Sequence, residues 1–211
     1  MSDNKSAPRT RRRRRDAEEN FVRVIDAARE VFAAEGTATS IEAVAERSGL
    51  GLGTIYRHFA NKEALVSELA RQLLEAAVGI AERHVASGED ALRDYLWEVG
   101  ELLSTQPGII RTIWNFPGSA PLTDRSRAAQ AALLRQAQHH GSVRADLVPE
   151  DVAVVLFAVT GILDIERGAS TDGWRRHLEM VLVGWGPDTP ALLHAPLTAA
   201  QIDTIIGRSQ P

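Results

Sequence analysis

The sequence predicts an all-α protein built from a small N-terminal helix-turn-helix unit and a larger helical C-terminal domain. Apolar residues recur at intervals of three to four along most of the chain, which is the period of one helix face. No stretch alternates apolar and polar residues in the manner of a strand, and glycine or proline separates the helical stretches. We assign residues 1–15 to a disordered basic arm, residues 16–62 to the helix-turn-helix unit and residues 63–211 to the C-terminal domain.

The composition is that of a chain that buries a core and lacks cysteine chemistry. Of its 211 residues 44% are hydrophobic, enough for one medium domain or two small ones. No cysteine is present, which excludes disulfides and thiolate sites and is compatible with a cytoplasmic location. The N-terminus has no apolar segment typical of a secretory signal. The most apolar stretch, Val152 to Leu163, is shorter than the roughly 18 residues of a membrane span, so we expect a soluble protein.

Charge is distributed unevenly along the chain. The net charge is −4, but residues 1–65 hold 12 Lys and Arg against 10 Asp and Glu, while the remainder holds 12 against 18. Such an asymmetry indicates an N-terminus that faces nucleic acid. Like charges without an apolar face predict disorder, and a disordered basic arm can follow the minor groove or the phosphates of DNA. The alternative is a solubilising tail. The arm's candidate DNA contacts are Arg11, Arg12, Arg13, Arg14 and Arg15.

Residue spacing predicts the first two helices of the helix-turn-helix unit. Five apolar residues share one face of a helix that begins near residue 16 and stops at Gly36; they are Phe21, Val24, Ile25, Ala28 and Phe32. Thr39 and Glu42 then fit a capping box, in which the Thr39 hydroxyl accepts from the amide of Glu42. The short helix that follows turns its apolar residues inward and ends at Gly49.

The stretch GLGLGTIYRHFANK, residues 49–62, predicts a third short helix that crosses the second at a steep angle. Glycine permits the positive φ and the close backbone approach that such a turn requires. A helix over about residues 53–59 turns Ile55 and Phe59 toward the core. Its other positions are those at which a recognition helix meets base edges in the major groove. They are Thr54, Tyr56, Arg57 and His58, with Leu52 and Gly53 at the tip.

Lys62 is a candidate phosphate contact. It stands in the first turn of a long fourth helix, which Asn61 can cap and which carries a stripe of leucines along one side. The helix dipole disfavours a cation at that position, and a bound phosphate would remove the penalty. The alternative is a solvated surface charge. We also place Thr39, at the start of the second helix, among the candidate DNA contacts.

The remainder of the chain is predicted to be helical, with one helix buried on all sides. The expected ranges are 89–105, 108–114, 124–140, 150–167, 174–183 and 199–206. The helix over 150–167 is apolar nearly all round. With the next helix it predicts a four-helix bundle between two copies of the chain, the alternative being a monomeric core. The expected interface residues are Val152, Val155, Leu156, Val159, Leu163, Trp174, Leu178, Val181 and Leu182.

Three segments in register carry a resemblance to a known family. TSIEAVAERSG (39–49), GTIYRHF (53–59) and NKEAL (61–65) resemble the N-terminal domain of TetR-type transcriptional regulators. The resemblance covers about residues 18–68 and implies an all-α homodimer. It implies a repressor whose two DNA-binding domains bind a palindromic operator. It also implies that the C-terminal domain binds a small molecule that releases the DNA. Tyr56 and Lys62 match the family's phosphate contacts, and Leu52, Thr54, Arg57 and His58 match recognition positions. Gly51 and Leu52 depart from the polar residues that many members carry there.

Candidate residues for the small-molecule pocket are aromatic and polar side chains of the C-terminal domain. We select Trp97, Arg111, Trp114, Phe116, His139 and Phe157. For each aromatic residue, packing in the core is the competing interpretation. The aromatic content of 5% favours an aliphatic pocket of modest size.

Two other classes of protein compete with the regulator. An enzyme would need catalytic or metal-binding spacing, but adjacent His139 and His140 diverge on a helix, as do Asp164 and Glu166, and no catalytic motif is present. We therefore expect no catalytic residue, metal or cofactor. An architectural DNA-binding protein would lack an effector site, and the acidic C-terminal half argues against it because DNA would repel that surface.

Overall fold

The computed structural model describes residues 7–88, 90–166 and 172–208, and these fold into helices without a strand. The all-α prediction is confirmed, and each expected helix is present; the ends differ by a few residues, except that α1 begins nine residues earlier than expected. The elements are α1 (Ala7–Glu35), α2 (Ile41–Ser48), α3 (Leu52–His58), α4 (Lys62–Val85), α5 (Ala91–Ser104), the 3₁₀ helix η1 (Ile110–Trp114), α6 (Ala120–His140), α7 (Pro149–Ile165), α8 (Gly173–Gly184) and α9 (Ala199–Arg208).

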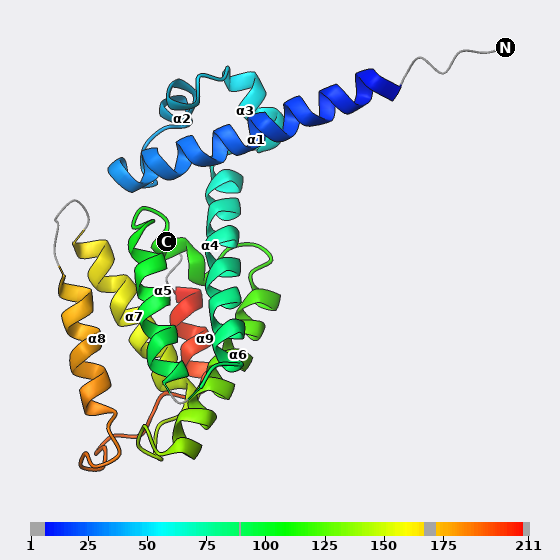
Figure 1. The fold of residues 1–211 in the computed structure, drawn as a ribbon. Coiled ribbons are helices and arrows are strands. Elements are labelled where there is room, and N and C mark those ends of the chain that lie inside the picture. The colour runs from blue at the N-terminus through cyan, green and yellow to red at the C-terminus, as the bar shows by residue number, and fades with distance from the viewer. Residues whose placement is uncertain (1–6, 89, 167–171, 209–211) are drawn as a thin grey trace.

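The helices form a head and a body joined by α4 (Figure 1). Helices α1 to α3 make up the head, and α4 runs from the head into the body, where it packs against α5, α6 and η1. One apolar core extends through both parts, and the predicted leucine stripe of Leu65, Leu69 and Leu73 on α4 is buried in it. The division of the chain into domains at residue 62 stays a prediction. No helix within the described ranges is both long and apolar enough to cross a membrane.

The basic arm is helical where the structure describes it. We expected residues 1–15 to be disordered, but residues 7–15 continue α1 past the head as a projecting rod (Figure 1); residues 1–6 lie outside the described part of the chain. Arginine is a good helix former. The five consecutive arginines contain one pair at i,i+4 spacing, Arg11 and Arg15, and the repulsion within this pair costs only a few tenths of a kcal/mol. The Arg15 guanidinium also donates to Glu19 at 2.8 Å, one helical turn later.

The start of α2 differs from the predicted capping box. The residue that precedes the helix is Ser40, and it makes no side-chain capping bond. The Thr39 hydroxyl instead donates to the Glu35 carboxylate at 2.7 Å, which ties the end of α1 to the turn that follows it. The prediction was wrong because the motif fixes only the order of residues, and a carboxylate from the preceding helix competes for the same hydroxyl. The cap at Asn61 is confirmed, since its Oδ1 accepts from the amide of Ala64 at 2.8 Å.

Seven of the nine residues predicted for a dimer interface belong to the core of a single chain. Val152, Val155, Leu156, Val159, Leu163, Trp174 and Leu178 are all buried, and Val181 and Leu182 are half-buried. Buried side chains cannot be covered by a second copy. Because α7 is apolar nearly all round, periodicity alone does not tell which face meets the chain's own helices, and the strongest stripe faces α5 and α6. Other apolar residues of the same two helices remain exposed, including Val154, Ile165, Met180 and Val183.

Candidate nucleic-acid interface and cavities of the body

The turn between α2 and α3 is a tight joint. Gly49 ends α2 with φ of 66°, a left-handed conformation that favours glycine. The Leu50 amide reaches back to the carbonyl of Ala45 at 3.3 Å. From α1, Arg23 donates through Nη2 to the carbonyl of Ser48 at 2.7 Å, which satisfies a free carbonyl at the end of α2. The predicted positive φ is therefore confirmed at Gly49, and the joint fixes α3 against α1 and α2.

Helix α3 buries one side and presents the other to solvent. Ile55 is completely buried and Phe59, directly after the helix, is nearly so. Tyr56 is 48% exposed, and Leu52 and Arg57 are also exposed. Thr54 is half-buried, and its hydroxyl accepts from Nη2 of Arg57 at 2.9 Å, so the guanidinium lies back along the helix in the free protein.

His58 packs against α1 rather than standing outside with its neighbours. Its side chain is half-buried, and its ring meets that of Phe21 edge to face with centroids 6.0 Å apart. Phe21 in turn stacks on Phe59 at 5.5 Å. The expectation that His58 lies on the outer face with Tyr56 and Arg57 was wrong in this respect. Spacing places His58 three residues after Ile55, so its side chain leans toward the buried side of a short helix.

Gly51 and Gly53 are not required by the fold. Their φ values are not positive, and a Cβ atom built at either residue has no neighbour within 4 Å. Both residues are exposed at the start of α3. The space around them is open on the side that a partner would approach, and glycine allows close contact with the backbone.

Lys62 bridges α4 and the turn before α2. Its Nζ donates to the carbonyl of Thr39 at 3.2 Å, and the side chain is partly buried. An ammonium group has three donors, so this bond leaves two for another acceptor. Thr39 itself contributes a carbonyl and a hydroxyl that are both engaged within the head.

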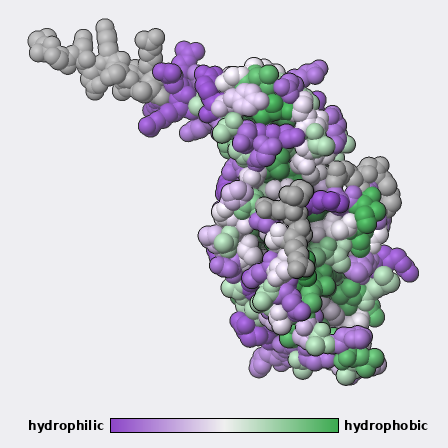
Figure 2. All heavy atoms as spheres, turned by 180° about the vertical axis from the view of Figure 1, so that it is seen from behind, coloured by the Kyte–Doolittle hydropathy of each residue, from purple (hydrophilic) through white to green (hydrophobic). Residues whose placement is uncertain are grey.

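The projecting part of α1 carries hydrophilic surface. Figure 2 shows hydrophilic residues along the projecting part of α1, whereas apolar surface gathers on the body on the side of α8. Arg11 to Arg15 are all exposed. Successive residues on a helix point about 100° apart, so these arginines surround the axis and cannot all face one surface.

Three of the six predicted pocket residues line one cavity, which we call the η1 cavity. It has a volume of about 440 Å³ and lies between η1, α7 and α9. Arg111, Trp114 and Phe157 line it, together with Thr160 and Asp164 of α7 and Ile205 and Ile206 of α9. The Arg111 guanidinium donates through Nε to the Asp164 carboxylate at 2.7 Å. Trp114 and Phe157 meet edge to face at 4.8 Å.

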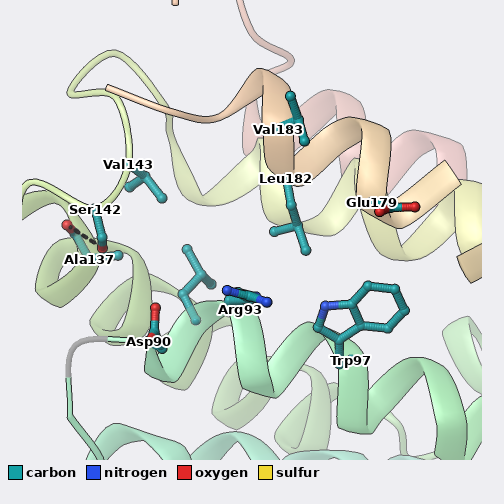
Figure 3. A pocket seen from close by; sticks show the side chains of 10 residues that line it. Asp90, Arg93, Trp97, Ala137, Ser142, Val143, Glu179, Leu182 and Val183 are labelled. Atoms are coloured by element: carbon teal, nitrogen blue, oxygen red, sulfur yellow. Dashed lines mark hydrogen bonds between the residues drawn. The ribbon is translucent and has the colours of Figure 1, made fainter. Parts of the chain in front are cut away.

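Trp97 lies in a different cavity, between α5 and α8, shown in Figure 3. This α5–α8 cavity has a volume of about 420 Å³. Arg93 and Trp97 enter it from α5, and Glu179 and Leu182 enter it from α8 (Figure 3). It mixes charges of both signs with apolar groups, and it lies at the end of the body away from the head, because it includes the start of α5 and the end of α8.

The two remaining predicted pocket residues line neither cavity. Phe116 is buried in a small apolar cluster with Ala70, Leu74 and Val78 of α4, so the competing interpretation of core packing is correct for it. His139 is exposed near the end of α6, beside His140. Sequence reasoning missed Thr160 and the two isoleucines of α9, since nothing in a ten-residue amphipathic stretch tells which surface it covers. Within the described residues, no group of three or more His, Asp or Glu side chains is placed to hold a metal ion.

Comparison with known proteins places the head in a described family. Residues 24–69 match the family model of bacterial regulatory proteins of the tetR family. An HTH-type transcriptional repressor of Mycobacterium tuberculosis is 32% identical over 136 residues, which is 61% of this chain and 71% of the relative. The HTH-type transcriptional repressor KstR2 of Rhodococcus jostii is 36% identical over 69 residues; this match covers 32% of this chain and only 34% of the relative.

Solved structures extend the likeness to the body. A TetR transcription regulatory protein from Mycobacterium vanbaalenii is 30% identical, with a TM-score of 0.54 over 73% of this chain and 98% of the other. SmeT, the repressor of a multidrug efflux pump of Stenotrophomonas maltophilia, has a TM-score of 0.59 over 83% of this chain and 96% of its own; at 20% identity it shows the fold alone. Taken with a head that exposes one side of α3 and a helical body below it, these matches show that the chain belongs to the TetR family of DNA-binding transcriptional regulators.

Proposed function

We propose that the protein is a repressor that binds a palindromic operator as a homodimer and leaves the DNA when a small molecule occupies its body. The observation that carries the DNA-binding half is the outer side of α3. Leu52, Gly53, Tyr56 and Arg57 are exposed there on a helix that is anchored to the head through the buried Ile55. The M. tuberculosis and R. jostii relatives are named as repressors, which supports repression here.

The contacts that we propose with DNA divide into two groups. Leu52, Gly53, Thr54 and Arg57 lie toward the start and the outer side of α3, where a recognition helix meets base edges. Tyr56 and His58 belong to the second half of the same helix, Lys62 begins α4, Thr39 precedes α2, and Arg11 to Arg15 lie on the α1 extension. We assign Tyr56 and Lys62 to phosphate contacts, because an exposed phenol and an ammonium group at the start of a helix can each donate a hydrogen bond to a phosphate oxygen.

The homodimer that we propose is formed by the exposed sides of α7 and α8. Val154, Met180 and Val183 are large apolar residues that these helices leave in water. A second copy of the chain is the partner that can cover an apolar face by symmetry. Two heads held about 34 Å apart would then meet successive major grooves on one face of the duplex.

The η1 cavity is the candidate effector site because one of its walls continues to the head. Gly108 precedes η1 by two residues, and a Cβ built on it lies 1.8 Å from the carbonyl oxygen of Phe32 on α1. Arg29 of α1 donates to Gln72 of α4 at 2.6 Å, which links the same end of α1 to the connecting helix. A ligand that shifts η1 would therefore push against α1 and change the position of the head, so that DNA affinity and ligand affinity are linked.

The test is a binding measurement with DNA selected from random sequence. Footprinting of the selected DNA should give a discrete site with two-fold symmetry, whereas an architectural protein would give diffuse protection. Tyr56→Phe removes one hydroxyl from an exposed side chain and should weaken operator binding several-fold without changing thermal stability. The Tyr56→Ala, Lys62→Ala double variant should lose at least tenfold while remaining folded by circular dichroism. Unchanged affinity of the folded double variant would contradict the proposed role of α3.

A further inference from the structure

The η1 cavity is largely apolar, and its mouth is exposed. Ile110 and Trp114 come from η1, Phe157 from α7, and Ile205 and Ile206 from α9. Ile165 and Ile205, which also line it, are 85% and 43% exposed in the free protein. A ligand with an apolar body would remove these side chains from water, and that removal is favourable in proportion to the apolar area covered.

The charges in this cavity are placed asymmetrically. The Asp164 side chain is 9% exposed and is built into α7, whereas the Arg111 side chain that pairs with it is 81% exposed. The carboxylate has therefore lost its water already on folding, while the guanidinium keeps most of its own. The oxygen Oδ2 of Asp164 accepts from Nε of Arg111 at 2.7 Å, and in the same ion pair it lies 2.5 Å from Nη2.

This asymmetry decides which sign of ligand charge the cavity accepts. A cation that enters replaces the guanidinium on Asp164, and Arg111 returns to water at little cost because it is already exposed. An anion would have to draw Arg111 away from Asp164 or share it, and would place a second negative charge beside a poorly hydrated carboxylate. The cavity therefore discriminates against anions through Asp164.

The aromatic residues favour the same choice. Trp114 and Phe157 pair edge to face, and Nε1 of Trp114 donates to the hydroxyl of Thr160 at 3.4 Å. The Thr160 hydroxyl in turn donates to the carbonyl of Phe157 at 2.9 Å, so that its hydrogen is not available to an anion. Aromatic rings attract cations through their negative faces, and indole does so most strongly.

We propose that the η1 cavity binds an organic cation with an apolar aromatic body, whose charged nitrogen takes the place of the Arg111 guanidinium at Asp164. The inference names the chemical class of the effector and rests on the proposed function only for the consequence of binding, not for binding itself.

A set of three probes with one apolar body tests the charge preference. They are 4-phenylbutylamine, which is protonated at neutral pH, the neutral 4-phenylbutanol and the anionic 4-phenylbutyrate. Binding to the full chain without DNA is measured by isothermal titration calorimetry. The ammonium probe should bind at least tenfold more tightly than either of the others. Equal binding of all three probes, stronger binding of 4-phenylbutyrate, or no binding of the amine would overturn the proposal.

Two variants assign the preference to Asp164. Asp164→Asn keeps the shape of the side chain and should reduce the preference for the amine over the alcohol to less than threefold. Glu150→Gln makes the same change at the start of α7, away from the cavity, and should leave it intact. Arg111→Gln removes the competing guanidinium from an exposed position and should tighten binding of the amine. If Asp164→Asn does not fold, weaker amine binding by Arg111→Gln than by the native chain overturns the proposal on its own.

The consequence for DNA is measured separately. Release of the selected operator by 4-phenylbutylamine is followed by fluorescence anisotropy, at concentrations set by the calorimetric affinity. Binding of the amine without release of DNA would contradict the proposed effector response and leave the cation site in place. Release of DNA by another compound, together with no amine binding, would overturn the cation site and support the regulator.

Discussion

Gly53 at the tip of α3 occupies a position where alanine would fit. Its φ is not positive and a Cβ there would meet nothing within 4 Å, so the free protein gains nothing from glycine. Alanine is favoured over glycine inside a helix by up to about 1 kcal/mol. We predict that Gly53→Ala raises the free energy of unfolding by about 0.5–1 kcal/mol and weakens operator binding by at least fivefold, because the added methyl group occupies space that DNA would use. Urea denaturation and anisotropy measure the two effects.

Gly79 on α4 provides a matched control for this substitution. A Cβ there would have the end of the Arg83 side chain as its nearest neighbour, at 3.9 Å, and the residue lies in the body rather than in the head. Gly79→Ala should give the same gain in stability with no change in DNA affinity. A Gly53→Ala variant that binds the operator as tightly as the native chain would show that the tip of α3 does not approach DNA closely.

Ionisation of the Tyr95 phenol makes the free energy of unfolding depend on pH in the alkaline range. Its phenol is buried on α5 and accepts a hydrogen bond from Nε2 of Gln130 at 2.9 Å. Burial raises the pKa of Tyr95 from 10.0 to about 12. Because the folded-state pKa is the higher one, the unfolded chain loses this proton first as the pH rises. The stabilisation from the neutral phenol is therefore complete below pH 10 and is lost as the pH rises toward 12.

The measurement compares the native chain with Tyr95→Phe. We predict that the native chain loses roughly 2–3 kcal/mol of unfolding free energy relative to the variant between pH 9 and pH 12, which corresponds to a shift of about two pKa units. Gln130 keeps the hydroxyl of Ser126 as a partner in the variant, so the variant should fold. Parallel pH profiles for the two proteins would mean that Tyr95 ionises as readily in the folded chain as in the unfolded one.

At the scale of elements, the helical form of the α1 extension decides which of its arginines can reach DNA. Arg14 is seven residues before Phe21 and fourteen before Ala28, so it shares the face of α1 on which the rest of the head packs. Arg12 points to another side, 160° away. We predict that Arg14→Ala weakens operator binding and lowers the slope of log affinity against log salt by about 0.9, the value for one phosphate, whereas Arg12→Ala changes both less.

Deletion of residues 1–15 sets the upper limit of this effect. A helix that lies beside DNA can place about two or three of five consecutive arginines near phosphates, so the slope should fall by about 2–3 rather than by 4–5. Both experiments use anisotropy titrations between low and physiological salt. Equal slopes for the deletion and the full chain would assign the arginines to a role other than DNA binding.

The elements differ in how far the sequence determines them. In the head, one stripe of apolar residues per helix leaves a single solution, so Val24, Ala28 and Ile55 are buried as predicted. The capping of α2 and the packing of His58 were not predictable, because each depends on a side chain from another helix. The cavity was half predictable: Arg111 and Trp114 lie together in η1, but the wall contributed by α9 arrives from about ninety residues further along the chain.

At the scale of the whole molecule, the proposed response requires that three features are physically connected: the cavity, the head and the surface between copies. The η1 segment joins the first two directly, through Gly108 against α1. The exposed apolar residues of α7 and α8 lie on the same helices that bury Val152 and Trp174 in the core. A dimer built on these helices would hold the two bodies rigidly, so that a movement at η1 changes the separation of the heads rather than that of the bodies.

The surface between copies is tested by a charge on its apolar side. We predict that Val154→Glu combined with Met180→Glu shifts the protein to a monomer in sedimentation equilibrium. Both positions are exposed in one chain, so the carboxylates are tolerated in the monomer, but they would lose their hydration in the dimer. Operator affinity should then fall by at least a hundredfold, since the two heads no longer bind as one unit. Leu193→Glu makes the same change at a 94% exposed residue outside the helices and should alter neither property. A double variant that remains dimeric and bound to DNA would place the contact between copies elsewhere on the body.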